Sequence, residues 1–246
     1  MPKITHCIFD MDGLLLDTER VYTEVTQEIV RTHGSGNGKE FTWDIKMRCM
    51  GRTMQDSTNI IITELQLPLT PEQYIAEKKR LEEEKFPLVK PLPGVEKLLR
   101  YLKDHGIPMV VATSSHKENF LLKTSRNQEL FQLFDHIICG DDPRVKHGKP
   151  APDIFIEAAK LIGNPAPENC LVFEDSVNGV EAGLAAGMHV CWVPDPNVRS
   201  RVDGDSGAVA VYSSLEEFDP EVFELPVFKL ENGEIHDEGD VEKVLS

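Results

Sequence analysis

The N-terminal stretch, residues 4–13, reads ITHCIFDMDG. Its apolar run is short and lacks helical spacing, which is typical of a buried strand. Two carboxylates, Asp10 and Asp12, follow directly, and Gly13 permits a sharp turn after them. Ionised side chains at the end of a buried strand are costly unless a cation or a proton compensates them. Asp10 and Asp12 are therefore candidate ligand-binding residues, and an ordinary strand-ending turn is the alternative. An EF-hand calcium loop is disfavoured because its fifth position here is Leu14.

Strand-like runs and helix-like segments alternate over most of the chain. Apolar runs predict further strands at 108–112, 136–139, 170–173 and 190–193. Helical spacing predicts helices at 93–105, 152–162 and 176–186, each followed by a glycine that is typical of a helix C-terminus. Because strands that alternate with helices form parallel βα units, the predicted fold class is α/β, a doubly wound parallel sheet.

Residues 17–90 interrupt this alternation, since they contain helix-like stretches and no convincing strand. Thr70-Pro71-Glu72-Gln73 predicts a helix start with a capping box. We therefore expect a helical domain, 17–90, inserted into an α/β core formed by 1–16 and 91–224. The acidic segment 225–246 is only weakly periodic and predicts a solvated tail.

Composition excludes several classes of function. The 246 residues include 26 basic and 42 acidic side chains, for a formal net charge of −16, which disfavours nucleic acid or an anionic membrane as partner. The chain has no apolar run of about 18 residues, no evident signal peptide and five scattered cysteines, so we expect a cytoplasmic protein with reduced thiols. A small phosphorylated ligand remains possible, because a metal ion and a few local cations reverse the field inside a pocket.

Polar residues follow the later strands as well. Thr113-Ser114-Ser115 leads into a helix and forms either a phosphate nest or a simple helix cap. Lys149 stands between a glycine and a proline, which fixes its position, although most lysines lie on the surface. Glu174-Asp175 ends another strand, and Asp175 as a helix cap is the alternative there. Two acidic strand ends in one sheet suggest a divalent cation with oxygen ligands, and Mg²⁺ fits best.

These motifs, in this order, resemble the haloacid dehalogenase (HAD) superfamily of phosphohydrolases. They are Asp10-Met11-Asp12-Gly13, Thr113-Ser114, Gly148-Lys149-Pro150 and Glu174-Asp175-Ser176, and the resemblance covers about residues 4–224. The position of the insertion resembles the subfamily with a helical cap over the active site. The resemblance implies a Rossmann-like core and a Mg²⁺-dependent phosphomonoesterase that acts on a small phosphorylated metabolite. Separately from the resemblance, we expect a monomer. Pseudouridine 5′-phosphate is the favoured substrate, with sugar phosphates and glycerol phosphate as alternatives.

The resemblance also implies roles for single residues. Asp10 would be the nucleophile that forms an aspartyl-phosphate, and Asp12 the acid and then the base. Thr113 and the Ser114 backbone would hold the phosphoryl group, and Lys149 would neutralise its charge. Asp10, the Asp12 carbonyl and Asp175 would hold Mg²⁺, with Glu174 as a further direct or water-mediated ligand. The acid role predicts that burial and the neighbouring Asp10 raise the pKa of Asp12.

Two alternatives to a phosphatase are a mutase and a non-enzymatic binding module. Mutases of the subfamily use a cap histidine and a cap arginine, and those positions align with Tyr22 and Met54 here. This departure favours hydrolysis. Arg52 and Lys117 are candidates for contact with the leaving group. The alternative for Arg52 is a surface position, and the alternative for Lys117 is that it only starts a helix. All four motifs carry competent side chains, which disfavours a binding module.

Overall fold

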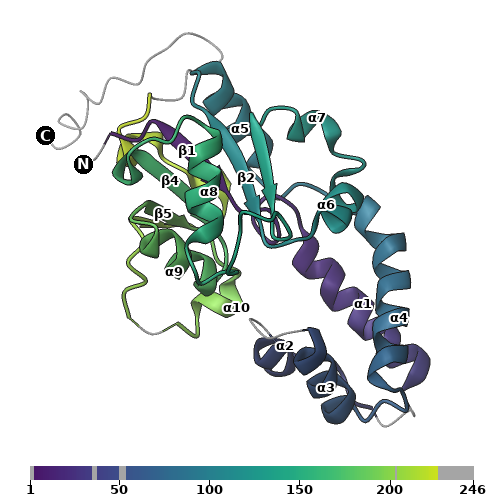
Figure 1. Ribbon diagram of the computed structural model, residues 1–246. Helices are drawn as coiled ribbons and strands as arrows, with labels where there is room; N and C mark the ends of the chain where they lie inside the picture. Colours follow the sequence, from purple (N-terminus) through teal and green to yellow (C-terminus); the bar gives the residue numbers. More distant parts are fainter. Residues whose placement is uncertain (1–2, 35–37, 50–53, 203, 227–246) are drawn as a thin grey trace, which may run out of the picture.

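The computed structural model describes residues 3–34, 38–49, 54–202 and 204–226. These residues form a six-stranded sheet in the order β3-β2-β1-β4-β5-β6, and all neighbouring strands are parallel (Figure 1). The strands are β1 (His6–Phe9), β2 (Met109–Thr113), β3 (His136–Cys139), β4 (Cys170–Glu174), β5 (His189–Trp192) and β6 (Ala210–Val211). The predicted doubly wound parallel sheet is confirmed, and the two-residue strand β6 is an addition to the prediction.

Alternate residues of the strands pack on opposite faces of this sheet. Ile8 and Val172 belong to a core cluster with helices α8 (Asp153–Leu161) and α9 (Val177–Ala185). Phe9 and Phe173 belong to a second cluster with helix α5 (Val95–Asp104), and their rings stack with centroids 4.4 Å apart. Because both faces are covered by helices, the central strands are apolar throughout, which explains why their sequences lack alternation.

The segment from Thr18 to Leu88 forms a group of helices beside the sheet (Figure 1). It consists of α1 (Thr18–His33), α2 (Trp43–Cys49), α3 (Met54–Leu65), α4 (Pro71–Lys85) and the 3₁₀ helix η1 (Phe86–Leu88). Thr70 caps α4 with the predicted capping box. We call this group the cap. Its two connections to the sheet lie side by side, since Leu16 and Pro91 form an antiparallel bridge.

The remaining helices are α6 (Lys117–Thr124), α7 (Gln128–Phe131) and α10 (Pro196–Arg199), with short 3₁₀ helices η2 (Pro167–Asn169), η3 (Leu215–Glu217) and η4 (Pro220–Phe223). The predicted solvated tail starts at residue 225, but the first two residues of this segment contact the core. Leu225 is buried, and the Tyr101 hydroxyl donates to the Pro226 carbonyl. Residues 227–246 lie outside the described part. The five cysteines all lie in the described residues, and none of them forms a disulfide there. In the described residues we find no helix that has the length and hydropathy of a membrane span.

Candidate active site

A buried lysine joins the ends of two strands. β1 and β4 pair in register with Phe9 opposite Phe173, so the next residues, Asp10 and Glu174, are neighbours. The Lys149 Nζ donates to Asp10 Oδ1 at 2.5 Å, to Glu174 Oε1 at 2.7 Å and to the Ala112 carbonyl at 3.2 Å. Lysine has three donors, so this ammonium is fully satisfied. The two carboxylates are thereby fixed at the point where the strand order reverses, which is where open α/β sheets bind ligands.

Glu174 uses its second oxygen to organise the start of α9. Its Oε2 accepts from the backbone N–H groups of Asp175 and Ser176, both at 2.9 Å, and from Ser176 Oγ at 3.0 Å. This arrangement requires a glycine one turn into the helix, because a Cβ on Gly179 would lie 1.8 Å from the Glu174 carboxyl carbon. The small residue that lets α9 approach the sheet therefore makes room for a buried charge.

The substitution Gly179→Ala is expected to displace Glu174 and to weaken its hold on Lys149. If the site hydrolyses phosphomonoesters, as the sequence motifs predict, we expect kcat/KM to fall about 100-fold, since a small misplacement of catalytic groups costs that much. The fall is measured against Glu181→Ala, an exposed change in the same helix, which should leave kcat/KM within about 2-fold. Equal kinetics in the two variants would show that the Glu174 position does not matter for the reaction.

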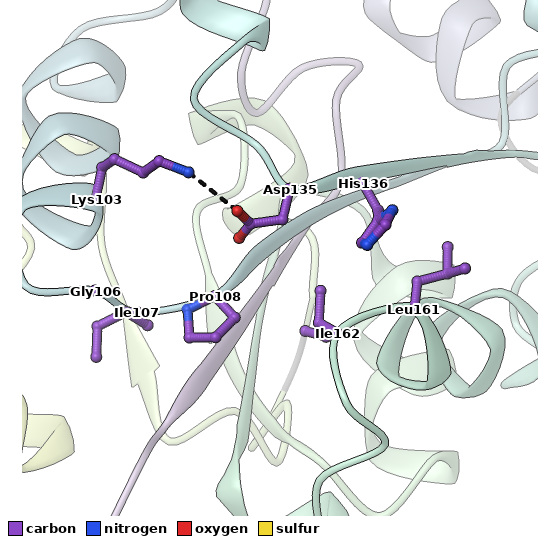
Figure 2. A pocket seen from close by; sticks show the side chains of 8 residues that line it. All are labelled: Lys103, Gly106, Ile107, Pro108, Asp135, His136, Leu161 and Ile162. Carbon is purple, nitrogen blue, oxygen red and sulfur yellow. Dashed lines mark hydrogen bonds and ion pairs between the residues drawn. The ribbon is translucent and has the colours of Figure 1, made fainter.

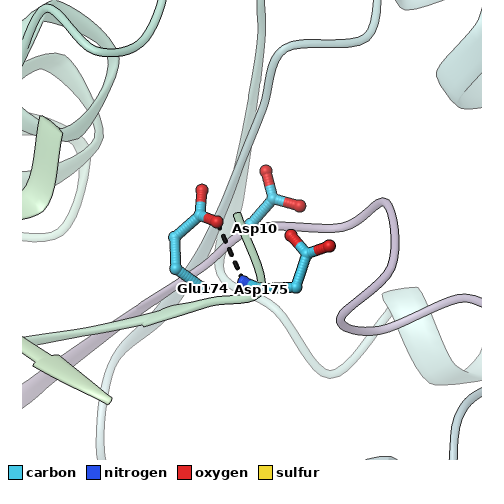
Figure 3. A group of neighbouring side chains, drawn as sticks. All are labelled: Asp10, Glu174 and Asp175. Atoms are coloured by element: carbon cyan, nitrogen blue, oxygen red, sulfur yellow. Dashed lines mark hydrogen bonds between the residues drawn. The ribbon is translucent and has the colours of Figure 1, made fainter. Parts of the chain in front are cut away.

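Asp175 completes a trio of carboxylates with Asp10 and Glu174 (Figure 3). One oxygen of each lies within 4.8 Å of the others. The turn at Gly13 allows this approach, because its φ is +81° and a Cβ there would lie 2.3 Å from Asp175 Oδ2. Three carboxylates face one ammonium, which leaves a formal charge of −2 that a divalent cation would balance. Carboxylate oxygens in this number suit a hard cation, so the residues present fit the metal that the sequence motifs suggest.

Burial, together with the neighbouring carboxylates, raises the pKa of both Asp10 and Asp175. Burial raises the pKa of Asp10 to about 7, with Lys149 lowering it and Glu174 and Asp12 raising it. Burial and the neighbouring Glu174 and Asp10 raise the pKa of Asp175 well above its ordinary value. A cation that binds these oxygens would stabilise the ionised forms and lower both pKa values, so metal binding should release protons near neutral pH.

Asp12 is held separately from the trio, on the side of α6. Its Oδ2 accepts from Ser115 Oγ at 2.8 Å and from Thr113 Oγ1 at 3.3 Å, and its Oδ1 accepts from Lys123 Nζ at 2.5 Å. The prediction of a raised pKa for Asp12 is wrong in this structure. Burial does raise it, but the charge and hydrogen bond of Lys123, aided by Ser115, outweigh burial and lower the pKa.

Sequence reasoning missed Lys123, which is fully buried. Phe120, Lys123 and Thr124 form the buried face of α6, whereas Leu121 is 57% exposed. The signal in the sequence was the spacing of Lys123 three residues after Phe120, which places both on one helix face. The neighbouring residues Leu121 and Leu122 are apolar, which favours their side of the helix as the buried one. The sequence pattern alone therefore does not identify which face of the helix points inward.

The site opens into a cavity of about 570 Å³ between the core and the cap. The core contributes Asp10, Asp12, Ser114, Lys149 and Asp175 to its wall, and the cap contributes Glu19 and Met47. Thr113 is buried beneath it and also accepts from the Ser115 N–H at 3.0 Å. Lys117 starts α6 with an exposed side chain outside the set that lines this cavity, and Arg52 lies outside the described residues.

A second hollow of about 350 Å³ lies at the opposite, amino-terminal end of the strands (Figure 2). Its charged residues, Lys103 and Asp135, form an ion pair of 3.0 Å, and the other Asp135 oxygen accepts from the Met109 N–H. These charges neutralise each other, and the carboxylate trio that would bind a cation for a phosphate lies at the other end of the strands.

Comparison with known proteins agrees with this geometry. The chain belongs to the family of haloacid dehalogenase-like hydrolases, whose model matches residues 4–187. A protein of Drosophila melanogaster, named probable pseudouridine-5′-phosphatase, is 44% identical over 228 residues, which cover 92% of this chain and 96% of the relative. The (DL)-glycerol-3-phosphatase 1, mitochondrial, of Arabidopsis thaliana is 44% identical over 233 residues, 92% of this chain and 76% of the relative.

Solved structures give the same family. The crystal structure of a HAD family hydrolase from Deinococcus radiodurans, with bound phosphate and sodium, superimposes with a TM-score of 0.74 and 25% identity, and the match covers 91% of this chain and 97% of that one. The chain is a phosphatase of this family, similar to enzymes named for small phosphorylated metabolites.

Proposed function

We propose that the chain is a Mg²⁺-dependent phosphomonoesterase in which Asp10 is the nucleophile. The observation that supports this most directly is the Asp10–Lys149–Glu174 bridge beside Asp175, which fixes one carboxylate at the edge of a cavity and leaves an excess of negative charge. Asp10, Asp175 and the Asp12 carbonyl would hold Mg²⁺. Both oxygens of Glu174 already have protein partners, which supports a water-mediated role. When bound, Mg²⁺ offsets the repulsion between the carboxylate and the phosphate dianion.

The reaction then follows from the chain's own residues. An Asp10 oxygen attacks phosphorus, the bond to the leaving oxygen breaks, and Asp12 gives that oxygen a proton. Asp12 next takes a proton from water as the water attacks the aspartyl-phosphate, which releases phosphate and restores Asp10. The ionised Asp12 of this structure is ready for the second step. An arriving phosphate dianion is a further negative charge near Asp12, so it raises the pKa and favours the protonated acid of the first step.

The cap wall of the cavity supports a polar leaving group. Glu19 lines the cavity, and its Oε2 pairs with Lys46 Nζ at 2.8 Å. A carboxylate there accepts hydrogen bonds from hydroxyl or N–H groups, which suits a nucleoside or a polyol. We therefore propose pseudouridine 5′-phosphate as substrate, with glycerol phosphate and sugar phosphates as the alternatives, in line with the names of the relatives. The proposed reaction needs no residue from a second copy of the chain, and we propose that the enzyme acts as a monomer.

Mutase chemistry receives no support from the cap. The Tyr22 hydroxyl, at the position of the mutase histidine, accepts from Lys123 Nζ at 2.8 Å. Burial and the nearby Asp12 also raise the pKa of Tyr22 far above neutrality. This side chain therefore does not exchange a proton with a sugar hydroxyl as an imidazole would.

A panel of phosphomonoesters tests the proposal, with pseudouridine 5′-phosphate, glycerol 3-phosphate and hexose phosphates ranked by kcat/KM. We expect phosphate release with Mg²⁺, loss of release with excess chelator, and the highest kcat/KM for pseudouridine 5′-phosphate. Conversion of a hexose 1-phosphate to its 6-phosphate without phosphate release would contradict hydrolysis.

A further inference from the structure

A buried lysine on α6 has no part in the mechanism above. Lys123 has a fully buried side chain, and its Nζ lies 4.7 Å from the Phe86 ring centroid and 5.1 Å from that of Tyr22. Both rings belong to the cap, whereas α6 belongs to the core. An ammonium removed from water in this way is costly unless its donors and its charge are compensated.

All three donors of Lys123 are in use. The Nζ donates to Asp12 Oδ1 at 2.5 Å, to Ser115 Oγ at 2.8 Å and to the Tyr22 hydroxyl at 2.8 Å. Because lysine has three N–H donors, none remains for a phosphate or a leaving group. The charge of Asp12 also raises the pKa of Lys123, which keeps the ammonium protonated. This lysine is therefore placed to act on Asp12 and not on the substrate.

The same contacts fix the Asp12 carboxylate. One oxygen is held by the ammonium, and the other by the hydroxyls of Ser115 and Thr113. Ser115 also accepts from Lys123, so the lysine orients one of the two hydroxyls as well. Without the ammonium, only neutral hydroxyls would remain around the Asp12 carboxylate, those of Ser115, Thr113 and Thr18, and rotation about its side chain would be less restricted. A misplacement of a catalytic group by about 1 Å costs about 100-fold in rate, so the orientation of this proton donor matters for the reaction.

We propose that Lys123 is a positioning residue, which orients Asp12 for proton transfer to the leaving oxygen of the substrate. The inference rests on the proposed function, in which Asp12 is the acid. It assigns the lysine no contact with substrate or metal.

The dependence of rate on the leaving group tests this role. An alkoxide needs a proton as it departs, whereas p-nitrophenolate departs readily without one, so only the first reaction should depend on a well-placed Asp12. The variant is Lys123→Met, which keeps the length and volume of the side chain. We expect kcat/KM to fall about 100-fold for an alkyl ester and by less than about 3-fold for p-nitrophenyl phosphate. The alkyl ester is pseudouridine 5′-phosphate or glycerol 3-phosphate, whichever the wild type hydrolyses faster.

Lys78→Met is the matched control. The Lys78 ammonium lies 5.2 Å from the centroid of the same Tyr22 ring and pairs with Glu82, and its side chain is only 20% exposed. It makes no contact with Asp12 in the described residues, so its removal should leave the ratio of the two kcat/KM values unchanged. A shifted ratio in Lys78→Met would assign the effect to the packing around Tyr22 and overturn the proposal.

Equal losses on both substrates, or no loss on either, would also overturn it. Circular dichroism reports whether Lys123→Met is folded, and the kinetic outcomes above apply to the folded variant. If Lys123→Met does not fold, Lys123→Gln replaces it, because the glutamine amide still donates to Asp12. We expect this variant to lose about 10-fold in kcat/KM for the alkyl ester alone. Failure of both variants to fold would make the lysine purely structural and overturn the proposal. These outcomes are distinct from failure of the proposed function, which would appear as wild-type protein that hydrolyses none of the esters.

Discussion

Asp10→Asn should reduce kcat/KM for every phosphomonoester at least about 10⁴-fold, because it removes the nucleophile and leaves no covalent route to hydrolysis. The amide keeps the size of the carboxylate, so cavity shape is preserved. Phosphate release with each substrate of the panel measures the effect. A binding module would be indifferent to the change, so turnover near the wild-type value would contradict catalysis through Asp10.

The same variant should stabilise the metal-free protein. The folded pKa of Asp10 is raised to about 7 by burial, above its unfolded value, so this carboxyl binds a proton more tightly in the folded state. Its contribution to stability is therefore present at low pH and is lost as pH rises through about 7. Asparagine does not ionise, so the Asp10→Asn protein avoids this loss of stability. We expect the Tm of Asp10→Asn at pH 8 with chelator to exceed the Tm of the wild type by at least about 2 °C.

The gain in Tm should shrink at pH 5, where the wild-type carboxyl is protonated. Glu181→Gln, an exposed change on α9, controls for the loss of one negative charge and should shift Tm by less than about 1 °C. A lower Tm for Asp10→Asn than for the wild type at pH 8 would contradict this prediction. It would mean that the ion pair with Lys149 stabilises the protein by more than the burial of the Asp10 charge destabilises it.

Lys149→Met should both inactivate and destabilise the enzyme. The ammonium is buried between Asp10 and Glu174, so its removal leaves two carboxylates without their cation. Removing one partner of a buried ion pair costs about 3–5 kcal/mol, and we expect at least about 3 kcal/mol at pH 8. Loss of a preorganised cation at the transferring phosphoryl group should lower kcat/KM at least about 10³-fold. Denaturant unfolding and phosphate release measure the two effects.

Two comparisons separate this explanation from loss of packing. The destabilisation should be smaller at pH 5, because Asp10 then takes up a proton that replaces the missing cation. Lys103→Met removes a lysine from a half-exposed pair with Asp135 and should cost less than about 1 kcal/mol. A Lys149→Met protein as stable as the wild type at pH 8 would show that the ammonium does not compensate these carboxylates.

Much of the architecture follows from local sequence. The stretch that ends at Asp10 lacks periodicity because both faces of β1 are covered by helices, and this buried, continuous pattern is itself the signal of a parallel central strand. The helix start at Thr70 also follows from local chemistry, since a capping box needs only residues within one turn. The short β6 escaped prediction because a two-residue strand has no period.

The candidate site shows the limit of this reasoning. Asp10, Lys149, Glu174 and Asp175 were identified because each stands at a strand end or in a constrained turn, and the parallel sheet brings them together. Lys123 gave no such signal. The lowered pKa of Asp12 depends on it, so the expected direction of that shift was wrong.

By itself, the sequence determined the first five strands, three of the helices that cover them and which carboxylates end strands, because these follow from periodicity and turn chemistry over a few residues. The tertiary structure decided which cation each carboxylate meets. Lys149 pairs with Asp10 across 139 residues and Lys123 with Asp12 across 111. Charge interactions depend on distance in space and on burial, and the packing of distant segments in the folded chain sets both.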